Sequence, residues 1–262
     1  MGYTMPMTNA IEHTICTNIK WLGRAHCGKC HIRHLMLFAG IPDSAFDKVL
    51  QPIDHHLLQP GTVIYEAGTQ KQFIYSIRRG LVKLTHITED GTYRIVRLLG
   101  PGAAIGLELL DDVDSYHYTA VAIDQVDLCK IPIPTIRKLE NLYPLLYERV
   151  ALNLQEQLDL ADQWIVTLGA GTAKQRVAQL ILFLHKNYPD KNGDFIMLNG
   201  EDMAAMLGIA SETVSRVIAE FKRQKLLLKK HGKLYSHDDA GLREIAGPDY
   251  KIRPTDPPHY QP

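Results

Sequence analysis

Residues 201–227, EDMAAMLGIASETVSRVIAEFKRQKLL, decide the fold, because they predict two helices joined by a tight turn at Gly208. In the second helix, apolar residues recur at the spacing of a face packed on a core: Val214, Val217, Ile218 and Phe221. The opposite face carries Glu212, Ser215 and Arg216, followed by Ala219. A carboxylate, a hydroxyl and a guanidinium on the first turns of an exposed helix are suited to reading base edges in a DNA major groove. The alternative is an amphipathic helix whose polar face only meets solvent.

Positive charge is concentrated directly after this helix, although the whole chain has a formal net charge of zero. Basic residues between Arg216 and Lys233 face a single acid, Glu220. Two β-prone runs, residues 226–228 and 234–235, flank a short turn, which predicts the wing of a winged helix. The wing lysines Lys229, Lys230 and Lys233 are expected to contact backbone phosphates. Ser211 and Thr213, at the start of the helix, complete the predicted DNA-binding set. A solvated basic loop is the alternative.

Length and composition predict two domains, because 262 residues with 45% apolar content exceed the usual size of one core. The chain has no apolar run of about eighteen residues and no signal-peptide pattern, so we expect a cytoplasmic protein. Cysteines in an intracellular chain are kept reduced, and the four present here therefore suggest metal or redox chemistry. No motif provides a convergent set of catalytic groups, so an enzyme is not expected.

The middle of the chain, residues 45–140, predicts a β-roll sensor domain. Phe73, Tyr75 and Ile77 alternate as in a strand, and Asp90-Gly91 between β-prone runs indicates a hairpin. Glycines punctuate the region about every ten residues, as in a small antiparallel barrel or roll. Such a roll often holds a small ligand, and an unliganded all-β sandwich has the same composition.

Residues 141–170 predict a dimerisation helix. The helix is expected to end near residues 169–171. Its apolar residues are spaced alternately by four and three, as in the seam of a coiled coil: Tyr147, Ala151, Leu154, Leu158, Ala161, Ile165 and Leu168. A symmetric homodimer is the simplest partner. The remaining boundaries are a cysteine-bearing arm with short helices over 1–44, a winged helix-turn-helix over 171–246 and a disordered tail over 247–262.

This α+β order of β-roll, long helix and winged helix resembles the CRP/FNR family of bacterial transcription regulators over about residues 30–246. The matching residues are Pro60-Gly61, the strand at 62–65, Ala67-Gly68, Arg79-Gly80, Gly102, Gly106 and residues 212–216. The E-x-x-S-R form of that last match is similar to the FNR branch. The resemblance implies a palindromic operator with TTGAT-type half-sites, in which Glu212 and Arg216 contact inner base pairs and Ser215 the thymine side. It also implies RNA polymerase as a partner.

The resemblance does not extend to cyclic-nucleotide binding. The branch that binds cyclic AMP has a Glu soon after the glycine of the roll and an Arg-Ser pair about ten residues later. This chain has Leu107 after Gly106, a displaced Glu108, and Tyr118-Thr119 at the Arg-Ser position. Cyclic AMP is therefore not expected as a ligand.

The cysteines predict a different input. Cys27 and Cys30 form a C-x-x-C, whose spacing lets two thiolates reach one metal or cluster. Resemblance to FNR-type oxygen sensors implies that Cys27, Cys30 and the remote Cys129 bind a [4Fe-4S] cluster. The third N-terminal cysteine of that family falls close to Met36 here, so Cys16 is the expected fourth ligand.

Three alternatives for the cysteines stay open. The C-x-x-C and Cys16 could form a zinc site with a nearby histidine: His13, His26 or His31. Cys129 could be an inert core thiol. The thiols could also sense oxidants directly by forming a disulfide.

Overall fold

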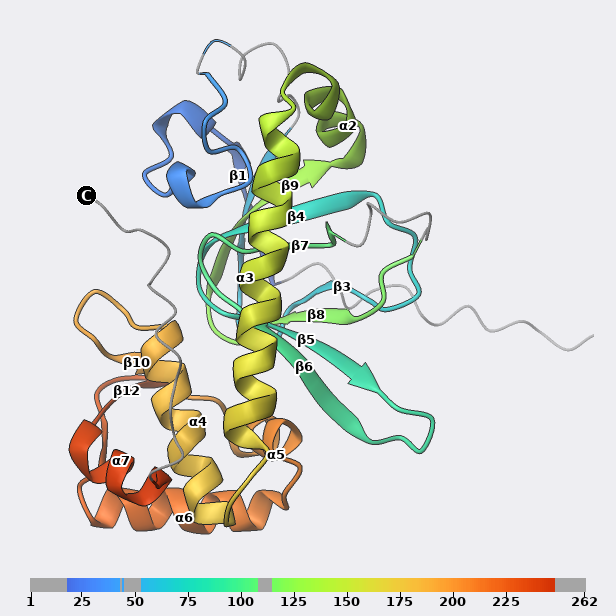
Figure 1. Cartoon of the computed structure of the whole chain (residues 1–262). Coiled ribbons are helices and arrows are strands. Elements are labelled where there is room, and N and C mark those ends of the chain that lie inside the picture. Colours follow the sequence, from blue (N-terminus) through green and yellow to red (C-terminus); the bar gives the residue numbers. More distant parts are fainter. Residues whose placement is uncertain (1–17, 43, 45–52, 108–114, 248–262) are drawn as a thin grey trace, which may run out of the picture.

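The computed structural model describes residues 18–42, 44, 53–107 and 115–247. These residues form a β-rich domain, one long helix and a helix-rich domain, in that order along the chain (Figure 1). This confirms the predicted α+β architecture. The predicted tail after residue 247 lies outside the described residues. No helix in the described ranges is both long and apolar enough to cross a membrane.

The β-rich domain is a roll of two antiparallel sheets. One has the order β1-β2-β9-β4-β7 and the other β3-β8-β5-β6. The strands are β1 (Ile19–Arg24), β2 (Asp54–Leu58), β3 (Val63–Tyr65), β4 (Phe73–Arg79), β5 (Val82–Ile87), β6 (Tyr93–Leu99), β7 (Ala104–Ile105), β8 (Thr119–Ala122) and β9 (Val126–Pro132). The predicted hairpin joins β5 to β6, with Gly91 at φ 80°. Gly80 also needs its positive φ, and a Cβ there would lie 2.6 Å from the Gln125 carbonyl oxygen.

Strand β4 is buried on both faces, which alternation alone did not predict. Tyr75 and Ile77 pack inside the roll. Ile74 faces the other way, into a second cluster that contains the N-terminal arm and the first half of the long helix. The arm carries two short 3₁₀ helices, η1 (Cys27–Lys29) and η2 (Arg33–Leu35). The roll therefore has an outer apolar surface as well as an inner one, and the arm covers it.

Two helices follow the roll, α2 (Ile133–Leu142) and α3 (Leu145–Leu168). Helix α3 ends at the predicted place, and in Figure 1 it runs in front of the roll down to the C-terminal domain. Two buried amides attach it to the roll. Asn153 Oδ1 accepts from the Ala104 N–H at 3.1 Å, and Gln157 Nε2 donates to the Ala104 carbonyl at 2.9 Å. These contacts fix which side of α3 faces the roll.

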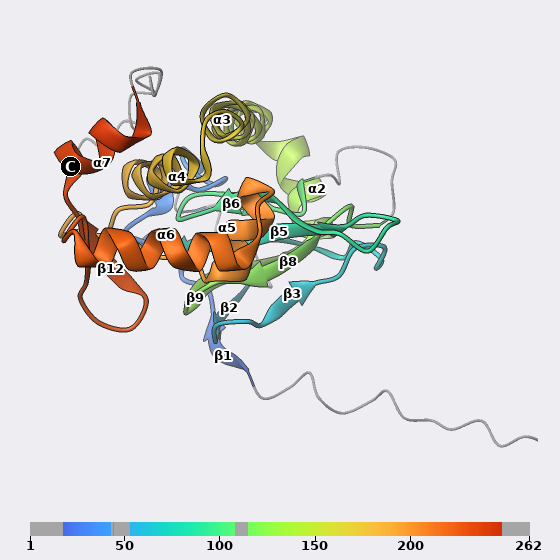
Figure 2. The same cartoon turned by 90° about the horizontal axis from the view of Figure 1, so that it is seen from below.

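The C-terminal domain is a winged helix. Its elements are α4 (Ala173–Asn187), β10 (Phe195–Ile196), α5 (Gly200–Leu207), α6 (Ser211–Arg223), β11 (Leu227–Lys229), β12 (Leu234–His237) and α7 (Asp239–Ala246). The strands pair in the order β10-β12-β11. The core of this domain is continuous with Leu81, Ile95 and Ile123 of the roll. Seen from below, α6 lies across the near face of the molecule (Figure 2).

Candidate nucleic-acid interface and cysteine pocket

The helix-turn-helix is built by local capping. Asn199 is the N-cap residue of α5, and its side-chain oxygen accepts a hydrogen bond from the backbone N–H of Asp202 at 2.7 Å. Gly208 ends α5 in the left-handed conformation, at φ 61°, which a side chain disfavours and glycine permits. The chain then turns at once into α6. The two helices therefore form the arrangement that the glycine predicted.

The two faces of α6 are those predicted from the sequence. Val214, Val217 and Phe221 are buried, whereas Glu212 and Arg216 are exposed. Ser215 is also exposed, and Ser211 and Thr213 at the helix start are partly exposed. The polar face of α6 is thus exposed to solvent.

The predicted wing is the hairpin of β11 and β12, with Lys229 paired to Tyr235. Lys229 and Lys230 are exposed. Lys233 is exposed as well, and its ammonium group also donates to the carbonyl of Ile123 in the roll at 2.9 Å. The wing lies against the roll at this point, so Lys233 is an interdomain contact in this conformation.

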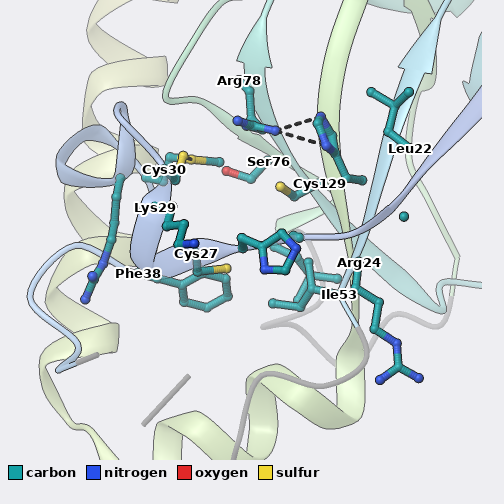
Figure 3. Close-up of a pocket in the computed structure, with 17 residues that line it drawn as sticks. Leu22, Arg24, Cys27, Lys29, Cys30, Phe38, Ile53, Ser76, Arg78 and Cys129 are labelled. Carbon is teal, nitrogen blue, oxygen red and sulfur yellow. Dashed lines mark hydrogen bonds between the residues drawn. The ribbon is translucent and has the colours of Figure 1, made fainter. Parts of the chain in front are cut away.

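Three of the four cysteines line one cavity of about 360 Å³, shown in Figure 3. Cys27 and Cys30 come from the arm, and Cys129 comes from β9, about a hundred residues later in the chain. Strand β9 lies between β2 and β4, where Cys129 pairs with His55 and Ser76. The arm folds over this sheet, and both of its cysteines pack against the cluster that contains Cys129. Cys16 and His13 lie outside the described residues.

The cavity is apolar and cationic. Among the described residues that line it, none is Asp or Glu, and four are basic: Arg24, Lys29, Arg33 and Arg78. Burial, followed by the neighbouring Cys30, raises the pKa of Cys27 to about 11. Burial likewise raises the pKa of Cys129 to about 12. Without a bound metal these two thiols are therefore protonated at neutral pH.

A polar network holds Arg78 at the edge of the cavity. His55 Nε2 lies 2.6 Å from the Arg78 Nη1 and 2.5 Å from Asp127 Oδ1. The Arg78 guanidinium also lies 3.6 Å from that carboxylate oxygen. The positive charge of Arg78 opposes the pKa rise of both Cys27 and Cys129. Arg78 is therefore placed to stabilise thiolates, a role that the sequence pattern did not reveal.

The donors at the cavity are of the kind that an iron–sulfur cluster uses. Within the described ranges, no three His, Cys, Asp or Glu side chains are close enough together to bind one metal ion. Three soft sulfur donors around a cavity without carboxylates are the ligands that such clusters use.

The largely aliphatic interior of the roll contains a stack of three tyrosines. The rings of Tyr65 and Tyr116 stack with centroids 3.8 Å apart, and Tyr75 stacks on Tyr65 at 5.7 Å. The Tyr116 hydroxyl donates to the Phe73 carbonyl at 2.7 Å. This packing holds together β3, β4 and the segment before β8. Glu108, the displaced acid of the sequence comparison, lies outside the described residues.

The predicted seam of α3 is mostly exposed along one side of the helix. Tyr147, Leu158 and Ile165 are 54%, 49% and 73% exposed, and Ala151 and Leu154 are also exposed. Ala161 is partly exposed. Leu168 differs, because it is 2% exposed and packs in the core of the C-terminal domain. Helix α4 turns back on the end of α3 and covers it.

Comparison with known proteins agrees with this architecture. The model of the cyclic nucleotide-binding domain matches residues 55–141, and that of the Crp-like helix-turn-helix domain matches residues 175–245. The transcriptional regulatory protein btr of Bordetella pertussis is 25% identical over 85% of this chain and 94% of its own. The fumarate and nitrate reduction regulatory protein of Vibrio cholerae is 25% identical over 85% of this chain and 90% of its own.

One solved structure has higher identity. It is a transcriptional regulator of the CRP/FNR family from Thermus thermophilus, 30% identical, with a TM-score of 0.57 over 73% of this chain and 97% of that one. The matched domains, their order and this identity agree with the sequence motifs. The chain belongs to the CRP/FNR family of DNA-binding transcription regulators, which are not enzymes.

Proposed function

We propose that this regulator responds to oxygen or redox state through a [4Fe-4S] cluster in the cysteine cavity. The observation that carries the proposal is the meeting of Cys27, Cys30 and Cys129 around one cavity. The C-x-x-C and Cys129 lie far apart in the chain, so their meeting depends on the arm folding over β9. Cysteine thiolates are the usual protein ligands of such clusters, and the fold brings three cysteines from two segments to one cavity.

The cluster would be held by these three thiolates and one further ligand, for which the sequence predicts Cys16. When bound, it supplies a group that oxygen converts or destroys. The basic residues around the cavity support this proposal, because they offset the negative charge of thiolates and sulfide. The similarity to the fumarate and nitrate reduction regulator of Vibrio cholerae also supports it.

The DNA-binding role is proposed in more detail on the exposure of α6. Glu212, Ser215 and Arg216 would read a TTGAT-type half-site. Lys229 and Lys230, exposed at the wing, would contact phosphates without reading sequence. A second copy, paired along the exposed side of α3, would present the second α6 to a palindromic operator. RNA polymerase is the further partner expected from the family.

A continuous apolar cluster connects the cavity to α3. Leu37 and Phe38 of the arm pack in the same cluster as Leu146 and Val150 of α3. Gly40 of the arm also lies close to Leu145, since a Cβ at Gly40 would be 2.9 Å from the Leu145 Cδ2. An iron–sulfur cluster that holds the arm on β9 would therefore stabilise the apolar surface that supports α3. Loss of the iron–sulfur cluster would weaken the packing of the arm against α3, and with it dimerisation and operator binding.

Anaerobic purification tests the proposal. The protein is expected to contain about four irons and four sulfides per chain, and Cys27→Ser, Cys30→Ser and Cys129→Ser are each expected to abolish the intact cluster. Exposure to air is expected to lower operator affinity and the dimer fraction together. Protein that contains zinc but no sulfide would show that the cysteines form a zinc site and not an iron–sulfur cluster. Metal-free protein that forms a reversible disulfide would show that the cysteines act as a thiol switch.

A further inference from the structure

We propose that Lys225, just beyond the end of α6, binds a phosphate of the DNA backbone, and that this role explains a lysine at a position suited to glycine. Among the described residues other than glycine, only Lys225 has a positive φ, at 60°. The Cβ of an L-residue disfavours this left-handed conformation, because it lies too close to the neighbouring carbonyl oxygen. A side chain kept at a strained position indicates a function that offsets the strain.

Two backbone hydrogen bonds hold residue 225 in this conformation. The N–H of Leu226 donates to the carbonyl of Phe221 at 2.9 Å, and the N–H of Lys225 donates to the carbonyl of Lys222 at 3.2 Å. These two bonds form the Schellman motif, in which the residue after the helix is left-handed and is most often glycine. Leu226 then packs against the core of the C-terminal domain. The end of α6 therefore requires the left-handed conformation at residue 225, whichever side chain is present.

The end of α6 presents positive charge to solvent. Lys225 is exposed, as are Arg223 before it and Lys229 after it. Glu220, the nearest acid in the sequence, is already paired, because its Oε1 lies 2.6 Å from the ammonium nitrogen of Lys174. The exposed cations at the end of this helix are therefore suited to an anionic partner, and the phosphates of duplex DNA supply that charge.

The length of α6 places Lys225 at the edge of the major groove. The helix has 13 residues. At 1.5 Å per residue it is about 20 Å long, whereas the major groove is about 12 Å wide. Glu212 and Arg216, the expected base-reading residues, are in its first half, so its last turn lies over the phosphate backbone. In Figure 2, α6 crosses the near face of the molecule, and β11 of the wing begins two residues after Lys225. Lys225 thus connects the base-reading face to the wing lysines.

The experiment compares four full-length proteins prepared in the same way: the wild type, Lys225→Gly, Lys225→Arg and the control Lys191→Gly. Lys225→Gly removes the charge and the strain together, whereas Lys225→Arg retains the charge. Lys191 is a matched control, because it is an exposed lysine of the same domain. It lies in the loop between α4 and β10, at the end of α4 away from α6 (Figure 1). Binding to an operator duplex and to a scrambled duplex is measured across a salt series, and Tm is measured for each protein.

Lys225→Gly is expected to weaken binding to both duplexes alike, roughly threefold to tenfold at about 0.1 M salt, and to reduce the slope of log K against log salt by about 0.9. Its Tm is expected to rise, on the order of 2 °C, because glycine adopts the left-handed conformation without strain. Lys225→Arg and Lys191→Gly are expected to bind as the wild type does.

Unchanged affinity and salt slope in Lys225→Gly overturn the assignment. A lower Tm for Lys225→Gly also overturns it, because the lysine would then stabilise the end of the helix. Phosphate contacts do not read sequence, so the scrambled duplex alone is sufficient for the test. The outcome is therefore independent of the proposed half-site and of the proposed iron–sulfur cluster.

Discussion

Lys83 of the roll and Asp202 of the helix-turn-helix form a buried ion pair, with the ammonium nitrogen 2.5 Å from the carboxylate Oδ1. Their side chains are 13% and 6% exposed. The Tyr93 hydroxyl lies 3.5 Å from the same oxygen. Because Asp202 is in the first turn of α5, the pair links the β5–β6 hairpin directly to the helix that precedes α6. It therefore helps to fix the position of the helix-turn-helix relative to the roll.

Removing Lys83 is expected to destabilise the junction between the domains. Lys83→Met leaves the Asp202 carboxylate buried without its cation, which costs roughly 3 kcal/mol for a buried pair. Urea unfolding of the full chain at neutral pH measures the change. Lys191→Met, at an exposed loop position, is the control and is expected to change the free energy of unfolding little. Equal values for the two variants would show that the pair does not stabilise the junction.

The acid stability of the C-terminal domain is expected to depend on His237. Burial lowers the pKa of His237, and His185 lowers it further, with the two ring centroids 4.3 Å apart. Below about pH 6.5 the unfolded chain binds a proton that the folded chain resists, so the free energy of unfolding falls as the pH decreases.

His237→Phe retains an aromatic ring against Phe195, whose ring centroid is 5.8 Å away, and removes the titrating group. Its free energy of unfolding is therefore expected to fall less between pH 7.5 and pH 5.5 than that of the wild type. His231→Phe, in the exposed wing turn, provides the comparison. Parallel pH profiles for the wild type and His237→Phe would exclude His237 as the source.

Sequence preference and general affinity are expected to separate on the DNA-binding surface. Glu212→Ala or Arg216→Ala should each cost about 1–3 kcal/mol on a TTGAT-N4-ATCAA duplex and relax one position of the half-site. Lys229→Ala or Lys230→Ala should weaken binding to every duplex and flatten the salt dependence. Binding to operator and scrambled duplexes across a salt series measures both effects. Wild-type affinities that do not differ between the duplexes would contradict sequence-specific reading by α6.

Dimerisation is expected to depend on the exposed seam of α3. Leu158→Lys places a charge on the predicted two-fold contact and should reduce the dimer association constant at least about tenfold, which corresponds to about 1.4 kcal/mol. Leu152→Lys is the matched control, because Leu152 is 54% exposed on the same helix but lies off the seam. Sedimentation at several concentrations measures the association. A stronger effect for Leu152→Lys would place the dimer contact on another side of α3.

The sequence by itself determined the features that depend on local pattern. The spacing of Val214, Val217 and Phe221 predicted the buried face of α6, and Gly208 predicted the turn before it. Asp90-Gly91 predicted the β5–β6 hairpin. These predictions succeeded because periodicity and turn chemistry act over a few residues, so the local sequence of a segment is enough to identify its buried face.

Only the tertiary structure decided which distant segments meet. The cysteine cavity depends on the arm lying over β9, and the Lys83–Asp202 pair joins residues 119 positions apart. Leu168 fits the seam by spacing, yet α4 folds back and buries it within its own chain. Lys233 has the sequence context of a wing lysine but donates to the roll. Local periodicity shows that a side chain is buried or exposed, whereas its partner depends on how domains dock, and a one-dimensional pattern does not record that docking.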